Sequence, residues 1–423
     1  MPRSLRVHPE YINQVKSAVK RNGYPRQRDL AEDLKISLAT VNNFLNGKAV
    51  DYLNFIEICQ RLVQEWQMIA EFDDDSDKQE SIEEQEVIAS DFYVERVPYE
   101  SQFYQEILKP GALIRLKAPQ QMGKTLLIER VLSQARAQGY QTLTLSFELA
   151  DSTVFTDLRK FSQWFCASIS QYLSLPNKLD EHWDDIFGCN SNTTAYFQDY
   201  LLPKIDSPLV VALDKVDLVF EHQEIANDFC RLLRSWYDIA RRGDRSSVLW
   251  KKLRLVVVHS TEVYSSLDIN HSPLAGVGLV VELQEFSPEQ VQDLARRHGL
   301  GWSATQVERL MAMVGGHPHL VQLAFHHIKH QGITLEQILQ TAPTEAGIYS
   351  NHLRRHLGTL QQHPELATAF SEVVKTDSWV TIESARVFKL HSMGLVKLQG
   401  NEVKPRCDLY RKYFCDRLQG ECR

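Results

Sequence analysis

Apolar positions along the chain follow two different periods, and the change from one to the other divides the sequence into regions. Between residues 92 and 285, short apolar runs alternate with amphipathic stretches. The runs predict strands at 112–117, 142–147, 209–213 and 253–259, and the stretches predict helices at about 124–137, 157–174, 193–202 and 224–242. Buried strands separated by helices are typical of a parallel sheet covered on both faces. We therefore predict an α/β core in this region.

After residue 285 the period becomes helical. Three capping boxes mark helix starts: Ser287-x-x-Gln290, Ser303-x-x-Gln306 and Thr334-x-x-Gln337. Residues 286–345 are therefore predicted to form an all-helical region. Residues 346–423 predict three helices, a hairpin with arms at 395–398 and 402–404, and a last helix at about 408–418. Three helices followed by a hairpin are the layout of a winged-helix domain.

The N-terminal region differs from the rest in pattern and in charge. Residues 1–70 predict an all-α domain with helices at about 9–22, 27–34, 38–45 and 52–67. Residues 1–48 carry nine Lys or Arg against four Asp or Glu, whereas residues 71–86 carry nine Asp or Glu against one Lys. This contrast, and the scarcity of large apolar residues, predicts an acidic linker over 71–91.

The composition is that of an ordinary folded protein, with 43% hydrophobic and 24% charged residues, which excludes disorder of the whole chain. The longest aliphatic stretches, 209–213 and 255–258, are much shorter than the ~20 apolar residues of a membrane-spanning helix. The N-terminus lacks the apolar run of a secretory signal. Seven scattered cysteines without a Cys-x-x-Cys pair indicate reduced thiols. We therefore expect a cytoplasmic protein.

The strongest local motif is Ala-Pro-Gln-Gln-Met-Gly-Lys-Thr at 118–125, between a predicted strand and a predicted helix. A P-loop requires this context, because its backbone N–H groups and the helix N-terminus converge on phosphate oxygens. Lys124 would reach the β- and γ-phosphates, and Thr125 would offer its hydroxyl to Mg²⁺. Ala118 stands where the first glycine is usual, and the alternative is a strand–turn–helix corner with an exposed lysine. The predicted nucleotide-binding residues of this loop are Pro119, Gln120, Gln121, Met122, Gly123, Lys124, Thr125 and Leu126.

A second segment, residues 209–214, is an apolar strand that ends in a carboxylate. This is the form of a Walker B strand, whose Asp214 would hold Mg²⁺ through water. Many ATPases place Glu after this Asp to orient or deprotonate water, whereas this chain has Lys215, and a protonated ammonium cannot accept a proton. Asp217 is the candidate substitute. The candidate catalytic residues are therefore Lys124, Asp214 and Asp217, and we expect ATP turnover to be slow.

A third segment, residues 255–261, is a strand that ends in the hydroxyls of Ser260 and Thr261. Ser260 stands where a γ-phosphate sensor would lie in an ATPase. The alternative is a strand end capped by Ser and Thr side chains. The residues alone leave both interpretations open.

Together these segments resemble the AAA-like domain of bacterial STAND-type signal-transduction ATPases, over residues 92–420. The matching segments, in the family's order, are Phe92-Tyr93-Val94-Glu95-Arg96, Gln-Met-Gly-Lys-Thr at 121–125, Leu-Asp-Lys-Val-Asp at 213–217, Val-His-Ser-Thr-Glu at 258–262, Gly315-Gly316-His317-Pro318 and Leu-His-Ser-Met-Gly-Leu-Val at 390–396. The family usually has Asp-Glu-Val-Asp at 214–217 and commonly Arg in place of Gln120. Both departures concern hydrolysis more than binding.

The resemblance implies a nucleotide switch that holds ADP when off, exchanges it when on, and then forms homo-oligomers. It implies that Tyr93 and Arg96 lie against adenine. It also implies that the turn of His317 and Pro318 brings residues 286–345, as a helical lid, to the nucleotide, and that the winged helix clamps the closed state. The cofactors implied are ATP or ADP and Mg²⁺, and no membrane partner is expected.

Residues 27–47 are similar to the helix-turn-helix of phage repressors, in which Leu30, Ala31, Leu34, Ile36, Val41 and Leu45 would pack the two helices. The predicted DNA-contacting residues are Arg28, Ser37, Thr40, Asn42, Asn43 and Lys48. The outward face of the second helix offers no Arg or Gln for bidentate reading of a base. Such modules also dock partner proteins in signalling ATPases, so DNA binding and protein docking both stay open.

Three functions are compatible with these features. The first is a STAND-type ATP switch in regulatory or defence signalling, with the N-terminal module for DNA or partner docking. The second is a DNA-binding AAA-type regulator of transcription or transposition that assembles on DNA with ATP. The third is an adaptor whose nucleotide site is inactive.

Overall fold

The computed structural model describes residues 4–8, 11–22, 24, 26–34, 36–48, 50–62, 70–71, 92–262 and 273–418. The chain forms two compact units, residues 1–87 and 88–423. Within the described residues, no helix is long and apolar enough to span a bilayer. Nearly all of the acidic linker predicted at 71–91 lies outside the described residues, and so does the end of the helix predicted at 52–67.

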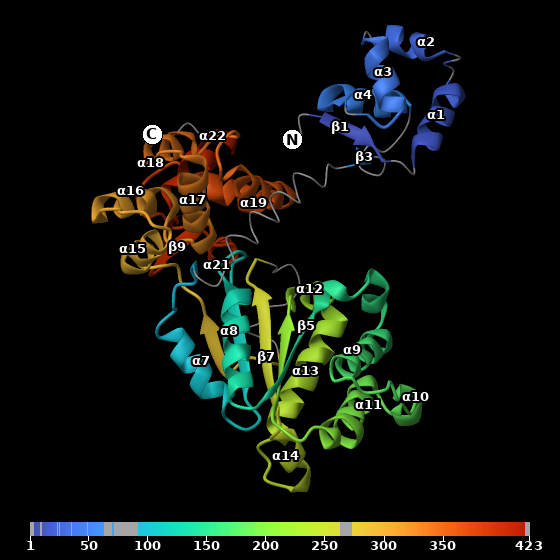
Figure 1. The fold of residues 1–423 in the computed structure, drawn as a ribbon, viewed down its shortest axis with the longest axis vertical. Coiled ribbons are helices and arrows are strands. Elements are labelled where there is room, and N and C mark those ends of the chain that lie inside the picture. Colours follow the sequence, from blue (N-terminus) through green and yellow to red (C-terminus); the bar gives the residue numbers. More distant parts are fainter. Residues whose placement is uncertain are drawn as a thin grey trace. The chain divides into compact units, whose positions relative to one another are not determined.

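The N-terminal unit combines short helices with a small sheet (Figure 1). Its helices are α1 (Ile12–Arg21), α2 (Gln27–Asp33), α3 (Leu38–Leu45) and α4 (Tyr52–Arg61), close to the predicted positions. The prediction of an all-α domain is wrong, because β1 (Ser4–Val7) pairs antiparallel with β2 (Val50–Asp51) and with β3 (Ala70–Glu71). Strands this short show no alternating pattern, and their partners lie far away in the sequence.

A compact apolar core holds α2 and α3 together. The side chains predicted to pack these helices are buried at Leu30, Ala31, Leu34, Val41 and Leu45, while Ile36 is half-buried against the same cluster. The turn between the helices is tight, because the Ile36 N–H donates to the Ala31 carbonyl at 3.1 Å. Phe44 of α3 meets Phe55 of α4 edge to face, with ring centroids 5.0 Å apart. The periodicity of this segment thus predicted its core correctly.

The second unit contains a five-stranded parallel sheet in the order β5-β6-β7-β4-β8. The strands are β4 (Leu113–Ala118), β5 (Gln141–Ser146), β6 (Leu209–Asp214), β7 (Leu253–Ser260) and β8 (Leu279–Glu282). The first four match the predicted strands. The sequence analysis did not predict β8, because it is a four-residue edge strand whose apolar run covers only residues 279–281.

Different helices cover the two faces of this sheet (Figure 1). One face packs against α7 (Tyr99–Ile107) and α8 (Lys124–Ala137), and the other against α9 (Leu158–Tyr172) and α13 (Gln223–Ile239). Neighbouring residues of one strand divide between the faces, so that Ile114 joins the first cluster and Leu113 the second. Because both faces are buried, the central strands carry apolar residues on both faces, and the sequence shows this as short apolar runs, interrupted by Arg115, Lys117 and Arg254.

The rest of the unit is helical apart from one hairpin. Its elements are α15 (Pro288–Arg297), α16 (Ala304–Val314), α17 (Pro318–Gln331), α18 (Leu335–Thr341), α19 (Ser350–Gln362), α20 (Pro364–Val374), α21 (Ser384–Ser392), β9 (Val396–Gln399), β10 (Glu402–Pro405) and α22 (Asp408–Arg417). All three predicted capping boxes are confirmed: Ser287, Ser303 and Thr334 each exchange both bonds with the glutamine three residues on.

One hydrophobic cluster joins the region predicted as a lid to the region predicted as a winged helix. Leu320 of α17, Phe370 of α20 and Phe414 of α22 are all completely buried in it. The β9–β10 hairpin is antiparallel, and Val380 bridges to Val403 at its edge. The elements after residue 285 therefore share a core that is separate from the two clusters on the sheet.

The expectation that all cysteines are reduced is wrong at Cys415, which is disulfide-bonded. A disulfide depends on the approach of two Cβ atoms in the folded chain, which cysteine spacing alone does not show. Cys59, Cys166, Cys189, Cys230 and Cys407 are free. Burial raises the pKa of the Cys166 thiol to about 12, so this side chain packs as a small apolar group.

Candidate functional site

The loop between β4 and α8 has the backbone of an anion-binding turn. Gln121 and Gly123 take left-handed conformations, with φ of 58° and 85°. Such residues among right-handed ones allow successive N–H groups to line a concave surface. Met122 is buried in the cluster on the adjacent sheet face, which anchors the loop. The loop leads directly into α8, whose positive N-terminal end favours a bound anion.

Lys124 folds back over this loop. Its Nζ donates to the carbonyl oxygens of Ala118 and Pro119, at 3.0 and 2.8 Å. Burial lowers the pKa of Lys124 to about 8, and the carboxylates of Asp217, Glu262 and Asp214 oppose this shift. The half-buried Lys124 ammonium therefore interacts electrostatically with three carboxylates.

β6 delivers Asp214 to the same edge of the sheet as the loop. The Asp214 Oδ1 accepts the backbone N–H of Lys215 at 2.9 Å, and burial raises the pKa of this carboxyl. Lys215 is left-handed, with φ of 57°, and its Nζ pairs with the Glu148 carboxylate at 2.9 Å. Lys215, which follows the aspartate predicted to hold Mg²⁺, is thus an ammonium paired with a carboxylate from another segment, and it offers no proton acceptor.

Asp217, the candidate substitute, is buried and already bonded. Its Oδ1 accepts the backbone N–H of Ser260 at 2.9 Å, which ties the end of β7 to the start of α12 (Asp217–Phe220). The Ser260 Oγ in turn accepts the N–H of Glu262 at 3.3 Å. These bonds are those of a capped strand end, and the sensor role of Ser260 stays a prediction.

The sequence did not single out Glu262, yet its carboxylate reaches the P-loop. Its Oε1 accepts the backbone N–H of Gln120 at 2.8 Å. Burial raises the pKa of Glu262, while the charges of Arg355 and Lys124 and the Gln120 N–H act in the opposite direction. One N–H of the loop that is expected to face phosphate therefore binds a carboxylate of the chain itself. The only sequence signal was an acidic residue directly after the third predicted segment.

Side chains from the elements after residue 285, called here the helical region, also reach the P-loop. His352 of α19 places Nδ1 3.0 Å from the Oε1 of Gln121, and its Nε2 lies 2.7 Å from the hydroxyl of Tyr410 on α22. All three groups are at least partly buried. A polar chain therefore links the P-loop to two helices that follow it by more than two hundred residues.

Two further contacts join the helical region to the P-loop and to the neighbouring end of β7. The Thr261 hydroxyl, at the end of β7, donates to the Ser392 carbonyl at the end of α21, at 2.6 Å. Gly394 packs directly on the loop, because a Cβ built there would lie 3.1 Å from the Cγ of Pro119. The P-loop and the neighbouring strand end thus form a contact surface for the helical region.

Of the two residues expected near adenine, only Arg96 reaches the loop. Its Nη2 donates to the Met122 carbonyl at 2.9 Å and its Nη1 to the Gln284 carbonyl at 2.7 Å. Burial lowers the pKa of Arg96 to about 10. The hydroxyl of Tyr93 instead donates to Glu100. Arg96 therefore bridges the P-loop and the segment that leads into the helical region.

The turn before α17 is packed against the same segment. A Cβ at Gly316 would lie 2.1 Å from the Phe286 carbonyl oxygen, so only glycine fits there. Pro318 is the first residue of α17, and the buried ring of His317 lies 5.2 Å from that of His352. This places His317 beside the histidine that contacts the P-loop, and its role at the nucleotide stays a prediction.

These residues fit a nucleotide with Mg²⁺. The Thr125 side chain is exposed in the first turn of α8, and hydroxyl and carboxylate oxygens such as those of Thr125 and Asp214 are ligands that Mg²⁺ prefers. Within the described residues, no group of three or more His, Cys, Asp or Glu is placed to hold a metal ion. A Mg²⁺ here would therefore depend on phosphate oxygens and water as further ligands, as is usual for this ion. When bound, it would neutralise phosphate charge.

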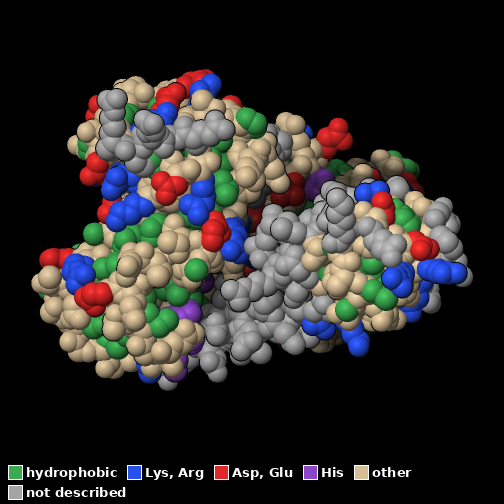
Figure 2. All heavy atoms as spheres, turned by 90° about the horizontal axis from the view of Figure 1, so that it is seen from above, with side chains coloured by type: hydrophobic (Ala, Val, Ile, Leu, Met, Phe, Trp, Pro, Cys, Tyr) green, Lys and Arg blue, Asp and Glu red, His purple; other side chains and the backbone are tan. Residues whose placement is uncertain are grey.

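The residues predicted to contact DNA lie on α2, on α3 and in the adjoining turns. The exposed ones are Arg28, Ser37, Asn42 and Lys48, and the half-buried ones are Thr40 and Asn43. Ser37 caps α3, since its Oγ accepts the Thr40 N–H at 3.0 Å. On the face shown in Figure 2, Lys and Arg side chains are scattered among acidic and hydrophobic ones and form no continuous patch.

Residues 81–416 match the AAA-like domain family. Among solved structures, a Walker-type ATPase of Pyrococcus abyssi has a TM-score of 0.53 at 13% identity, over 76% of this chain and 96% of that one. The ORC2 protein of Aeropyrum pernix, in ADPNP–ADP complexes, has a TM-score of 0.43 at 13% identity, over 78% and 96%. Cdc6p of Pyrobaculum aerophilum has 0.40 at 14%, over 79% and 98%. No curated protein matches the chain.

The first of these structural similarities is one of fold, and it agrees with the α/β core and the P-loop predicted from the sequence. The family match extends across the P-loop, Asp214 and the helical region up to α22. It therefore covers most of the 423 residues and all the contacts described around Lys124. The chain belongs to the AAA-like domain family.

Proposed function

We propose that the chain binds ATP and ADP with Mg²⁺ at the P-loop and acts as a STAND-type switch in regulatory or defence signalling. The observation that carries this proposal is that the helical region rests on the P-loop itself, through His352 on Gln121 and Gly394 on Pro119. A nucleotide at the loop changes the surface on which these groups rest. Its binding is therefore coupled to the position of the helical region.

The finer assignments follow from this arrangement. In this proposal α15–α18 are the lid, and α19–α21 with the β9–β10 hairpin are a winged helix that clamps the closed state. Arg96 and His317 are the adenine-side residues of the closed state. The α2–α3 pair is a helix-turn-helix that docks a partner or DNA, and the ATP-bound chain forms homo-oligomers.

Hydrolysis is slow in this proposal. The Lys215 ammonium pairs with Glu148 and offers no base, and the Asp217 carboxylate is bonded to the Ser260 N–H. General-base assistance is typically worth about 10²–10⁴-fold in rate, so its lack leaves a chain that binds nucleotide far better than it consumes it.

Titration of the full chain with ATP and with ADP in MgCl₂, by calorimetry, tests the proposal. The Lys124→Ala variant is the matched blank, because it removes the loop cation. We expect wild type to bind both nucleotides and the variant to bind neither measurably. Hydrogen exchange of β9 and β10 with and without ATP then reports the coupling. If ATP binds but hydrogen exchange of β9 and β10 does not change, the chain has a nucleotide site and the proposed switch is refuted.

A second function is favoured by the exposure of Arg28, Asn42 and Lys48 around α3. In it, the chain assembles on duplex DNA with ATP as a regulator of transcription or transposition. Light scattering and DNA-stimulated turnover distinguish the two functions. ATP-dependent assembly on duplex DNA that is lost in the Lys48→Ala variant would favour this second function. ATP-dependent assembly to the same extent with and without DNA would favour the switch. Failure to bind any nucleotide would leave only an adaptor.

A further inference from the structure

Arg355 is a cation of α19 that contacts the histidine next to the P-loop. Its Nη2 is 3.5 Å from the His352 Nδ1, the same atom that lies 3.0 Å from the Oε1 of Gln121. Burial, together with the charge of Arg355, lowers the pKa of His319 to about 4 and that of His356 to about 3. These histidines are therefore uncharged near neutral pH and add no second cation beside the guanidinium.

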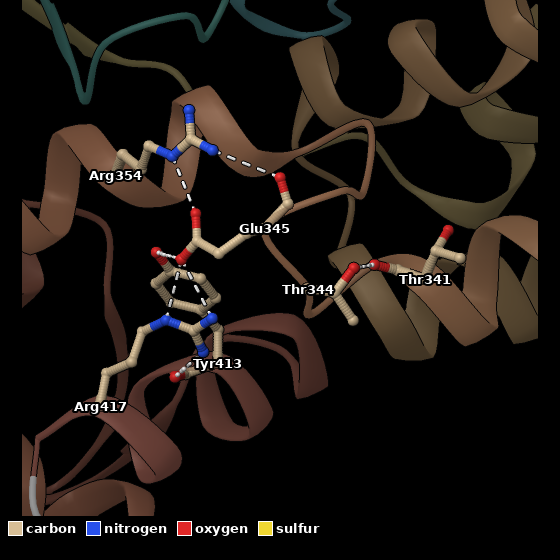
Figure 3. A network of polar contacts seen from close by, with 6 residues as sticks. All are labelled: Thr341, Thr344, Glu345, Arg354, Tyr413 and Arg417. Atoms are coloured by element: carbon tan, nitrogen blue, oxygen red, sulfur yellow. Dashed lines mark hydrogen bonds and ion pairs between the residues drawn. The ribbon is translucent and has the colours of Figure 1, made fainter. Parts of the chain in front are cut away.

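Among the described residues, the guanidinium of Arg355 also forms no direct ion pair with a carboxylate, while it acts on Glu262 through its charge. Its Nε is buried without a hydrogen-bond partner in the described part of the chain. The adjacent Arg354 shows the usual alternative: its Nε pairs with the Glu345 carboxylate at 2.8 Å, in a network with Tyr413 and Arg417 (Figure 3). Guanidinium groups pair strongly with carboxylates and phosphates. A half-buried one without such a partner is suited to an anion that binds there.

The carboxylate on which the charge of Arg355 acts is Glu262. Of the charged groups that act on the Glu262 carboxylate, Arg355 has the largest effect, followed by Lys124. The same carboxylate accepts the Gln120 N–H of the P-loop. Glu262 thus accepts a loop N–H, and the charges of Arg355 and Lys124 favour its ionised form, as they would favour a phosphate oxygen there.

We propose that Arg355 is a ligand of the nucleotide's phosphates, and that Glu262 occupies the phosphate position of the P-loop in the nucleotide-free chain. Nucleotide phosphate and the Glu262 carboxylate then compete for the same N–H and the same two cations. The inference rests on the proposed nucleotide binding and deepens it. Because Arg355 and His352 belong to one helix, phosphate binding would act directly on α19.

The first test is calorimetric titration of the full chain with ATP, ADP and AMP in MgCl₂. We expect Arg355→Gln to weaken ATP and ADP binding by about 10–100-fold, the scale of a charge-assisted bond, with a smaller effect on AMP. Arg355→Lys should restore part of the loss, since it keeps the charge. Arg354→Gln is the matched control, because it removes the neighbouring arginine of α19, and it should leave affinity unchanged.

The second test removes the competing anion. Glu262→Gln should tighten ATP and ADP binding by about tenfold, because a group that occupies the site lowers apparent affinity by the fraction of time that it is bound. Glu282→Gln is the control: it removes one charge at a surface pair with Lys117, and it should have no such effect. Unchanged or weaker binding by Glu262→Gln would overturn the competition.

The third test needs no nucleotide. Arg355→Gln leaves Glu262 buried with one fewer counter-charge, so its thermal midpoint should fall, and adding Glu262→Gln should recover much of that loss. If wild type binds no nucleotide, the proposed function fails, and the phosphate role of Arg355 fails with it. If wild type binds ATP and Arg355→Gln binds it equally well, only this inference fails. Equal thermal midpoints for Arg355→Gln and for the double variant with Glu262→Gln would refute the electrostatic interaction between Arg355 and Glu262.

Discussion

Replacing Gly394 with alanine should weaken the contact between the helical region and the P-loop. Gly394 has a φ of 74°, and an added Cβ would lie 3.1 and 3.2 Å from the Cγ and Cβ of Pro119. Alanine in the left-handed region costs about 1–2 kcal/mol. Forcing a methyl group into a packed contact costs a further ~1–3 kcal/mol. The free energy of unfolding of this unit should therefore fall by about 2–5 kcal/mol.

Gly400→Ala separates these two costs. Gly400 lies in the β9–β10 turn with a φ of 59°, and within the described residues a Cβ there would meet nothing inside 4 Å apart from its chain neighbours. This variant pays the conformational cost alone. Urea unfolding of both variants gives the comparison, and we expect Gly394→Ala to lose about 1–3 kcal/mol more. Equal losses would refute the reasoning, since the Pro119 contact would then contribute nothing.

Three further predictions follow from the site and its surroundings. Lys215→Glu should raise ATP turnover at least about tenfold, because it restores a base after the metal-type aspartate; phosphate release measures it, and no rise would mean that this lysine is not limiting. Arg406→Gln should lower the free energy of unfolding by about 3–5 kcal/mol, because its 2.7 Å pair with Glu285 joins side chains only 14% and 15% exposed; a loss below about 1 kcal/mol in urea unfolding would class the pair with surface ones. Burial holds the pKa of His319 at about 4 and that of His356 at about 3, whereas in the unfolded chain both are near 6.5. The unfolded state therefore takes up protons first, and stability should fall as pH drops below 6.5, by about 2 kcal/mol for each such histidine at pH 5; unfolding midpoints that do not change between pH 7.5 and 5 would contradict this.

Some features were predictable because each depends on one short segment. The strands β4, β6 and β7 carry short apolar runs, since a parallel sheet buries both faces. The capping boxes depend on two side chains three residues apart, and all three are present. The P-loop likewise combines a strand, a turn and a helix start in one continuous stretch.

Other features depend on segments that meet only after folding. The strands β1 to β3 are short, and each pairs with a distant part of the chain. No local sequence pattern therefore predicts them. β8 lies at an edge, where a single buried residue is enough to hold it. Periodicity reports burial of a segment against some partner, but it does not report which partner.

The sequence by itself determined the α/β core, the loop that can bind phosphate, and the replacement of the usual base by Lys215, because these are properties of contiguous residues. Only the tertiary structure placed His352 on Gln121, 231 positions earlier in the chain, and Glu262 on the Gln120 N–H, 142 positions earlier. It also brought the charge of Arg355 to act on that carboxylate. Hydrogen bonds and charge interactions act over a few ångströms and leave no periodic trace in sequence. Their partners are therefore decided by how the helices after residue 285 pack on the sheet.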